Sequence, residues 1–283
     1  MGTIEVILFF LGSFSGFLAG LLGIGGAIVL IPLLMYIPPL VGVTFSFHTI
    51  TGLSMTQVFF SALTGAITHF KGGNLRKNLI IVVGGAMLAG SLIGSVASKF
   101  MDGRALQIVF ASVLAISIYM LIKPKSDTDV SAGKTMAAAG NGAACEVGHD
   151  HNEQPEYMIS INEKILGASL GGAAGVLSGM AGVGGAAMLI PALSYFLRIP
   201  IKICIGTSLG IILAGGTAGF IGKAATGQVP FVPALFLVIG AIAGARIGSK
   251  VSMKLKSQQL RKILAVVLII TLIRIVITIV TTV

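Results

Sequence analysis

The stretch GFLAGLLGIGGAIVLIP, residues 16–32, recurs as GVLSGMAGVGGAAMLIP at residues 175–191, and this repeated phrase is the most informative feature of the sequence. Ten of 17 positions are identical, and both copies lie inside long apolar runs. A glycine costs roughly 1 kcal/mol in a helix interior, so several glycines within one turn predict that a helix ends there. A helix that breaks at membrane depth in both halves of a chain is typical of a transporter's substrate site.

The composition indicates an all-α polytopic membrane protein. The 283 residues are 55% hydrophobic and 10% charged, with a mean hydropathy of +1.01, whereas about a quarter of a soluble domain is charged. Several apolar stretches reach the roughly 20 residues that span a bilayer. The net charge of +10 does not indicate nucleic-acid binding, because the basic residues fall in short loops, where they set membrane topology. We therefore expect a multi-pass protein of the cytoplasmic (inner) membrane, in contact with the lipid bilayer.

The similarity between the two copies continues beyond the glycine phrase. Its offset is 159 residues at the phrase and 154 afterwards, so each half contains the same predicted elements. We predict three regions: repeat 1 at 1–123, a polar cytoplasmic linker at 124–160 and repeat 2 at 161–283. Cys145, His149 and His151 in the linker could bind a metal, but a solvated loop is the favoured interpretation. No metal or cofactor is predicted.

The first apolar segment of each half, at 4–36 and 165–197, is too long for one straight crossing. Its 33 residues would extend about 50 Å at 1.5 Å per residue, against a hydrocarbon core of about 30 Å. The segment either crosses once as a broken helix or turns back as a re-entrant hairpin. Two single crossings would put the basic loops 71–77 and 250–262 on opposite sides.

Hairpins agree better with the rule that cytoplasmic loops are rich in Lys and Arg. They place fourteen basic residues in cytoplasmic pieces and leave Lys99, Arg104 and Lys223 in outer loops. We therefore predict two inverted repeats, each a broken, re-entrant helical hairpin plus three transmembrane helices.

The glycine break has the chemistry of an anion site. We expect the first helix to end near Leu22, the chain to turn through four residues, and a short helix to begin near Ala27. The start of that helix presents unpaired N–H groups and partial positive charge, and the second copy does the same from the other side. Polar residues that follow each hairpin could bond an oxyanion, although they could instead bond a neighbouring helical turn. The candidate substrate-binding residues are Gly23, Gly25, Gly26, Gly182, Gly184, Gly185, Thr51, Ser54, Gln57, Thr207 and Ser208.

The distribution of charge favours an anionic ligand. All nine acidic residues lie in loops or at segment ends, whereas a cation transporter would be expected to carry an acid in its membrane core. His48 is a candidate for proton coupling, with an interfacial histidine of no role as the alternative. Arg246 could attract a sulfonate or extend to the membrane surface. The glycine pairs and triplet Gly16 and Gly20, Gly90 and Gly94, and Gly240, Gly244 and Gly248 fit helix-packing faces.

These motifs resemble the sulfite exporter TauE/SafE family. The resemblance rests on the duplicated GxxxGxxGxGGxxxxxP phrase, followed in each half by G-x-S or G-T-S, a short glycine-containing loop and GxxxG. It covers both halves and excludes the linker, which is longer than expected. The resemblance implies transport of small sulfur-containing anions: sulfite, thiosulfate, sulfoacetate or other organosulfonates.

The predicted function is a secondary transporter of such a small anionic substrate, working by alternating access at the paired glycine breaks. A passive anion channel of the same architecture is the alternative. A membrane-embedded enzyme is disfavoured, because Cys204 is the only nucleophile at membrane depth and has no paired base. The oligomeric state stays open, with a homodimer as one alternative.

Overall fold

The computed structural model describes residues 2–70, 77–122, 161–196, 201–255 and 257–281, which form helices joined by short turns and contain no strand. The linker predicted at 124–160 lies outside the described residues, as do Cys145, His149 and His151. The first half contains α1 (Gly2–Leu22), α2 (Ala27–Leu40), α3 (Phe47–Phe70), α4 (Lys77–Ala97), the 3-10 turn η1 (Ser98–Phe100) and α5 (Gly103–Ile122). The second half contains α6 (Ile161–Ala181), α7 (Ala186–Phe196), α8 (Ile201–Ala225), α9 (Phe231–Lys254) and α10 (Ser257–Thr281).

The lengths of these helices match a protein that crosses a membrane several times. Six described helices are long and apolar enough to cross a bilayer, namely α1, α3, α4, α5, α8 and α9. In contrast, α2 has 14 residues and α7 has 11, and at 1.5 Å per residue each is shorter than the hydrocarbon core. The prediction of an all-α polytopic membrane protein is confirmed.

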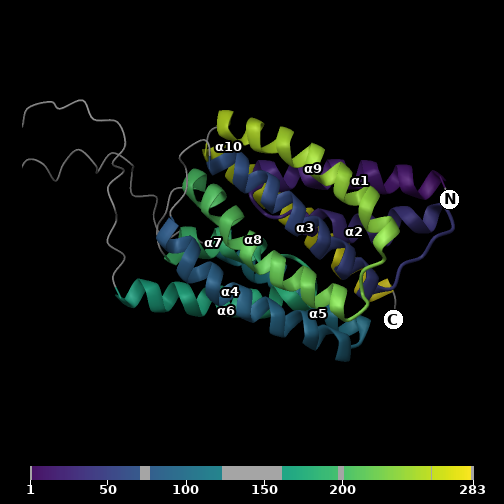
Figure 1. The fold of residues 1–283 in the computed structure, drawn as a ribbon, viewed down its shortest axis with the longest axis horizontal. Coiled ribbons are helices and arrows are strands. Elements are labelled where there is room, and N and C mark those ends of the chain that lie inside the picture. Colours follow the sequence, from purple (N-terminus) through teal and green to yellow (C-terminus); the bar gives the residue numbers. More distant parts are fainter. Residues whose placement is uncertain (1, 71–76, 123–160, 197–200, 256, 282–283) are drawn as a thin grey trace, which may run out of the picture.

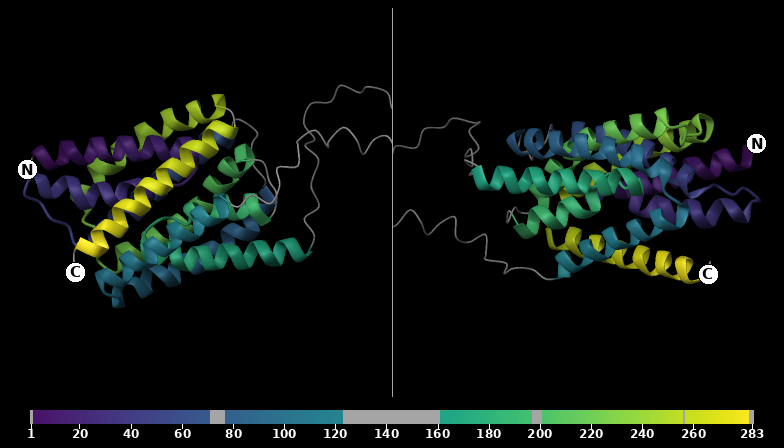
Figure 2. Two further views of the ribbon diagram at one scale, coloured as in Figure 1. Left: turned by 180° about the vertical axis from the view of Figure 1, so that it is seen from behind. Right: turned by 90° about the horizontal axis from the view of Figure 1, so that it is seen from below.

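Each short helix folds back beside the helix before it. Four residues separate α1 from α2 and another four separate α6 from α7, and α2 returns toward the end of the bundle where α1 begins (Figure 1). Figures 1 and 2 place the start of α1 and the end of α10 at one end of the bundle, and the start of α6 at the opposite end. The two hairpins therefore enter from opposite ends. The inverted-repeat topology and its cytoplasmic and outer faces stay a prediction.

The two halves interlock because each hairpin packs against a helix of the other half. The helix α1 lies along α9, and α6 lies along α4 (Figure 1). Glycines make this approach close: a Cβ added at Gly16 or Gly244 would lie under 3.0 Å from the backbone of the other helix. The helix-packing faces predicted from the sequence are thereby confirmed. The same holds at Gly12, Gly20, Gly240 and Gly248 in the first pair, and at Gly90, Gly94, Gly175 and Gly179 in the second.

Candidate functional site

The two glycine turns have nearly the same backbone conformation. The φ angles of Gly23, Gly25 and Gly26 are 70°, 70° and 78°. In the second copy, Gly182, Gly184 and Gly185 have φ angles of 73°, 72° and 69°. Residues with a Cβ rarely adopt this left-handed region. The sequence G-x-G-G is thus the one that lets the chain reverse within four residues.

Each turn leads into the first backbone amides of a short helix, which lack the acceptors that later turns of the helix have. The amides of Val29 and Leu30 both donate to the carbonyl oxygen of Gly26, at 3.2 and 3.0 Å. In the second copy, Met188 and Leu189 donate to Gly185, also at 3.2 and 3.0 Å. The amides that precede these donors have no intrahelical acceptor and carry the positive end of the helix dipole.

Both turns converge on Val58, in the middle of α3. A Cβ added at Gly25 would lie 3.2 Å from Val58 Cγ1, and one added at Gly184 would lie under 3.0 Å from the same atom. Val58 itself is fully buried. The two glycine turns, each directly before the start of a short helix, therefore contact the same valine side chain from opposite halves of the chain.

A buried polar face of α3 lines the two turns. Ser54 Oγ donates to the carbonyl oxygen of Gly182 at 2.7 Å, and Ser61 Oγ donates to that of Gly25 at 3.2 Å. Gln57 is fully buried beside the first turn, where its Nε2 donates to Ser15 Oγ at 2.9 Å. Its Oε1 has no hydrogen-bond partner within the described part of the chain. A buried amide oxygen left unpaired is unusual.

The second half supplies fewer polar groups. Ser208 Oγ donates to the carbonyl oxygen of Gly23 at 3.2 Å, which repeats the Ser54 contact with the halves exchanged. Thr207 is fully buried next to it. The offset of 154 places Ile205 where the first half has Thr51, and the side chain of Ile205, which contacts the first turn, has no hydroxyl. The polar lining of the site is therefore one-sided.

His48 and Arg246 are the remaining candidates from the sequence. His48 is half-buried at the start of α3, where its carbonyl oxygen accepts the Thr51 hydroxyl at 2.9 Å. Arg246 is exposed on α9, in agreement with a side chain that extends toward the membrane surface. The structure thus brings the six glycines, Thr51, Ser54, Gln57 and Ser208 into one region.

The prediction that Lys223 lies in an outer loop is wrong. The helix α8 continues to Ala225, and Lys223 is fully buried inside the bundle. The apolar run ends before this lysine because a charged residue lowers local hydropathy, although the backbone remains helical. A signal was present in the repeat itself, since the offset of 154 aligns Lys223 with His69 at the end of α3.

The two serine bonds between the halves predict unequal losses of stability. We expect Ser54→Ala to lower the free energy of unfolding by about 1 kcal/mol, the usual worth of a hydrogen bond between membrane helices. Ser208→Ala should cost less, because its bond is 3.2 Å against 2.7 Å. Chemical denaturation of purified protein in detergent measures both. Ser112→Ala is the matched control, because Ser112 is exposed and bonds Val109 within α5; a Ser54→Ala loss no larger than this control would contradict the expectation.

The bundle of apolar spans, with two reversing glycine turns at its centre, defines a multi-pass α-helical membrane protein. Comparison with known proteins identifies its family. The profile of the family Sulfite exporter TauE/SafE matches residues 8–275. The chain belongs to this family.

Curated relatives in the family carry transporter names. Probable membrane transporter protein YunE of Bacillus subtilis (strain 168) is 28% identical over 244 residues, which cover 83% of this chain and 84% of the relative. A Probable membrane transporter protein of Xylella fastidiosa (strain 9a5c) is 30% identical over 223 residues, 77% of this chain and 73% of the relative. No solved structure matches the chain. The chain is accordingly a membrane transporter.

Proposed function

We propose that this protein is a secondary transporter of a small sulfur-containing anion, namely sulfite, thiosulfate, sulfoacetate or another organosulfonate. The observation that carries the proposal is the convergence on Val58 of the two glycine turns, each of which leads directly into the start of a short helix. Free backbone amides at a helix start bind anions readily, and here the turns that precede two such helix starts contact one residue from opposite halves. The sulfur chemistry of the anion follows from the family, Sulfite exporter TauE/SafE.

The charges of the described spans support an anion. Glu5 and Glu163 lie in the first turns of α1 and α6, and Asp102 lies between η1 and α5. These are helix ends, so the described residues around Val58 contribute backbone donors, hydroxyls and one amide, and no negative charge. A cation at this depth would lack the carboxylate partner that such sites normally provide.

Gln57 would complete the binding site on the polar side. Its amide now donates to Ser15 and leaves Oε1 unpaired. If the side-chain amide of Gln57 rotated by about 180°, Nε2 would take the place of the unpaired Oε1. From there Nε2 could donate a hydrogen bond to an oxyanion. The side chain would then respond to the ligand without any movement of α3.

Alternating access would use the two hairpins as opposed gates. Each turn is bonded to the other half, through Ser54 to Gly182 and through Ser208 to Gly23. Val58 and Met87 fill the space against Gly184 and Gly185, so the conformation described is closed around the turns. A closed, tightly packed centre favours a gated transporter over a passive channel.

Uptake by reconstituted protein tests the proposal. Liposomes with purified protein should accumulate labelled sulfite, thiosulfate or sulfoacetate, and uptake should saturate and show counter-flow. Saturation and counter-flow distinguish a transporter from a channel. The flux through a channel would keep rising with anion concentration and would show no counter-flow. Absence of both uptake and binding across the whole panel would reject the function.

Substitutions of Gln57 separate its role in binding from its role in stability. We expect Gln57→Glu to reduce anion uptake by at least about tenfold, because a carboxylate beside Gly26 repels the substrate and one charged contact is worth about 1.5–3 kcal/mol. Gln57→Leu should also reduce uptake but leave thermal stability unchanged or higher, since it removes a buried unpaired oxygen.

The matched control for Gln57→Glu is Gln107→Glu. Gln107 lines a separate cavity of about 200 Å³ between the C-terminal end of α2 and the start of α3, and no residue of the glycine turns lines this cavity. The same charge added there should leave uptake within about twofold of the parent. A twofold change is much smaller than the effect expected from the loss of one charged contact. Equal losses in both variants would show that added charge alone causes the effect.

A further inference from the structure

Lys223 is a buried lysine whose hydrogen-bond partners in the described part of the chain are all uncharged. Its side chain is fully buried near the C-terminal end of α8. Nζ donates to Ser98 Oγ at 2.7 Å, to Thr51 Oγ1 at 3.0 Å and to Gln228 Oε1 at 3.0 Å. The carbonyl oxygen of Met180 lies at 3.5 Å. These atoms come from α8, α3, η1, α6 and the segment before α9.

The surrounding groups are oriented as acceptors. The Thr51 hydroxyl donates its own proton to the His48 carbonyl at 2.9 Å, and the Ser98 hydroxyl donates to the Ser95 carbonyl at 2.7 Å. Gln228 directs its Nε2 to Thr226 Oγ1 at 2.8 Å. Three lone pairs therefore point at Nζ, which matches the three donors of a charged lysine.

A charge held this way lacks a counter-charge. No carboxylate of the described residues bonds Nζ, and the negative end of the α8 dipole offers only partial compensation. Ionisable residues inside membrane spans are costly and commonly mark the path of an ion or substrate. An ammonium with neutral ligands gains most from a ligand that brings a full negative charge.

The position of Lys223 places this charge beside the second glycine turn. Thr51 contacts Gly182, since a Cβ added at Gly182 would lie under 3.0 Å from Thr51. Val58 is seven residues farther along α3, which is about 10 Å at 1.5 Å per residue. The C-terminal end of α8 lies at the end of the bundle that holds both chain termini (Figure 1). Lys223 thus stands between that end and the point where the turns converge.

We propose that Lys223, Thr51, Ser98 and Gln228 form an access subsite for a small oxyanion, on the path from this end of the bundle to the glycine turns. The arriving anion replaces one or more of the neutral oxygens at Nζ and then moves on to the helix starts near Val58. The second repeat has no equivalent subsite, because the residue that corresponds to Thr51 there is Ile205, which has no hydroxyl. This inference rests on the proposed function and adds a second binding position to it.

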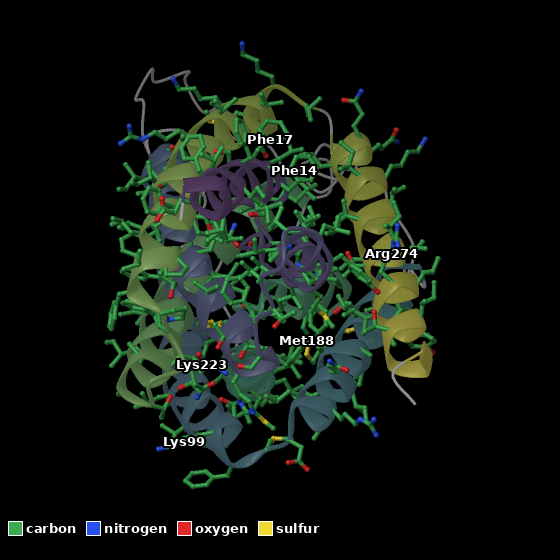
Figure 3. All side chains as sticks on the ribbon, turned by 90° about the vertical axis from the view of Figure 1, so that its right-hand side faces the viewer. Phe14, Phe17, Lys99, Met188, Lys223 and Arg274 are labelled. Atoms are coloured by element: carbon green, nitrogen blue, oxygen red, sulfur yellow. The ribbon has the colours of Figure 1, made fainter. Side chains whose placement is uncertain are left out.

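The test compares two lysines at the same end of the protein. Figure 3 shows Lys223 within the bundle and Lys99 at its rim, and Lys99 is exposed. In liposome uptake of methanesulfonate, we expect Lys223→Gln to raise KM roughly 10- to 100-fold, the worth of a hydrogen bond to a charged group, with a smaller change in the maximal rate. Lys99→Gln should leave KM unchanged. Lys223→Arg should keep part of the affinity, because it retains the charge.

A second readout separates anion binding from a structural role. Purified protein is titrated with methanesulfonate and with its neutral isostere dimethyl sulfone. The unsubstituted protein should prefer the anion, and Lys223→Gln should lose most of that preference. A merely structural lysine would lower the melting temperature of the variant without changing the preference, and that result would overturn the inference.

Ser98→Ala tests the subsite with Lys223 retained, and remains informative if Lys223→Gln fails to fold. Loss of one neutral acceptor removes a competitor for Nζ, so we expect KM for methanesulfonate to fall severalfold while the apo protein becomes less stable. An unchanged or higher KM would contradict the access subsite. If the unsubstituted protein neither binds nor moves any anion of the panel, the proposed function fails; if it does and Lys223→Gln keeps its KM, only the access subsite fails.

Discussion

Replacing Gly184 with alanine is expected to abolish transport and to reduce the yield of folded protein sharply. Gly184 has a φ of 72°, where a residue with a Cβ is strained by about 1–2 kcal/mol. The new Cβ would also lie under 3.0 Å from Val58 Cγ1, and overpacking of this kind costs typically about 1–3 kcal/mol. Both effects act at the point where the two turns meet, so the geometry of the helix starts would be lost. Uptake in liposomes and gel-filtration yield measure the outcome.

A control and a rescue make this result interpretable. Gly42→Ala has the same backbone strain, with a φ of 78°, but an added Cβ there meets open space. Gly42→Ala should lower the stability only by the backbone strain at the positive φ angle and should leave transport largely intact. Val58→Ala combined with Gly184→Ala should recover part of the folding yield, because it removes the atom that clashes. Absence of any recovery in the double variant would show that the clash with Val58 is not the cause.

Gly244→Ala is expected to prevent stable folding, although alanine is the better helix former. An added Cβ would lie under 3.0 Å from the carbonyl oxygen of Ser13 on α1, and also from the backbone amide of Phe17. Neither group is a flexible side chain, so α1 and α9 would have to separate along their whole contact. Membrane helices associate mainly through such close packing. Thermal unfolding in detergent, monitored by light scattering, should show a large drop in the transition temperature.

Gly85→Ala is the matched control for that substitution. Gly85 lies inside α4, and an added Cβ finds nothing within 4 Å. The expected result is unchanged or increased stability, by up to about 1 kcal/mol. A transition temperature for Gly244→Ala equal to that of Gly85→Ala would refute the role of close backbone packing between α1 and α9.

The helix ends at the two glycine turns were predictable from the sequence for a local reason. Three glycines within four residues indicate a turn with positive φ angles, and such φ angles are observed at all three. The end of α1 and the start of α2 can therefore be inferred without knowledge of any distant contact. The glycine faces of α1 and α9 were predictable for a similar reason, since spacing of four residues places them on one side of a helix. Which two faces meet depends on the topology, and residue spacing does not encode it.

The surroundings of Lys223 could not be predicted in the same way. Hydropathy assigned this lysine to a loop, and its three ligands lie far apart in the sequence, at Thr51, Ser98 and Gln228. Each of them is an ordinary polar residue when read alone. Only the folding of five separate segments around one position turns them into ligands of a buried charge.

The packing of α1 on α9 and of α6 on α4, each across the two halves, affects the biosynthesis of this protein. The glycine face of α1 is completed by α9, which the ribosome synthesises only after most of the chain has entered the membrane. Until then, the hairpin of α1 and α2 is surrounded by lipids and translocation machinery and lacks its contact with α9. Biogenesis should therefore conclude in one late step that depends on the whole chain, and a nascent chain truncated after α8 should remain accessible to membrane proteases.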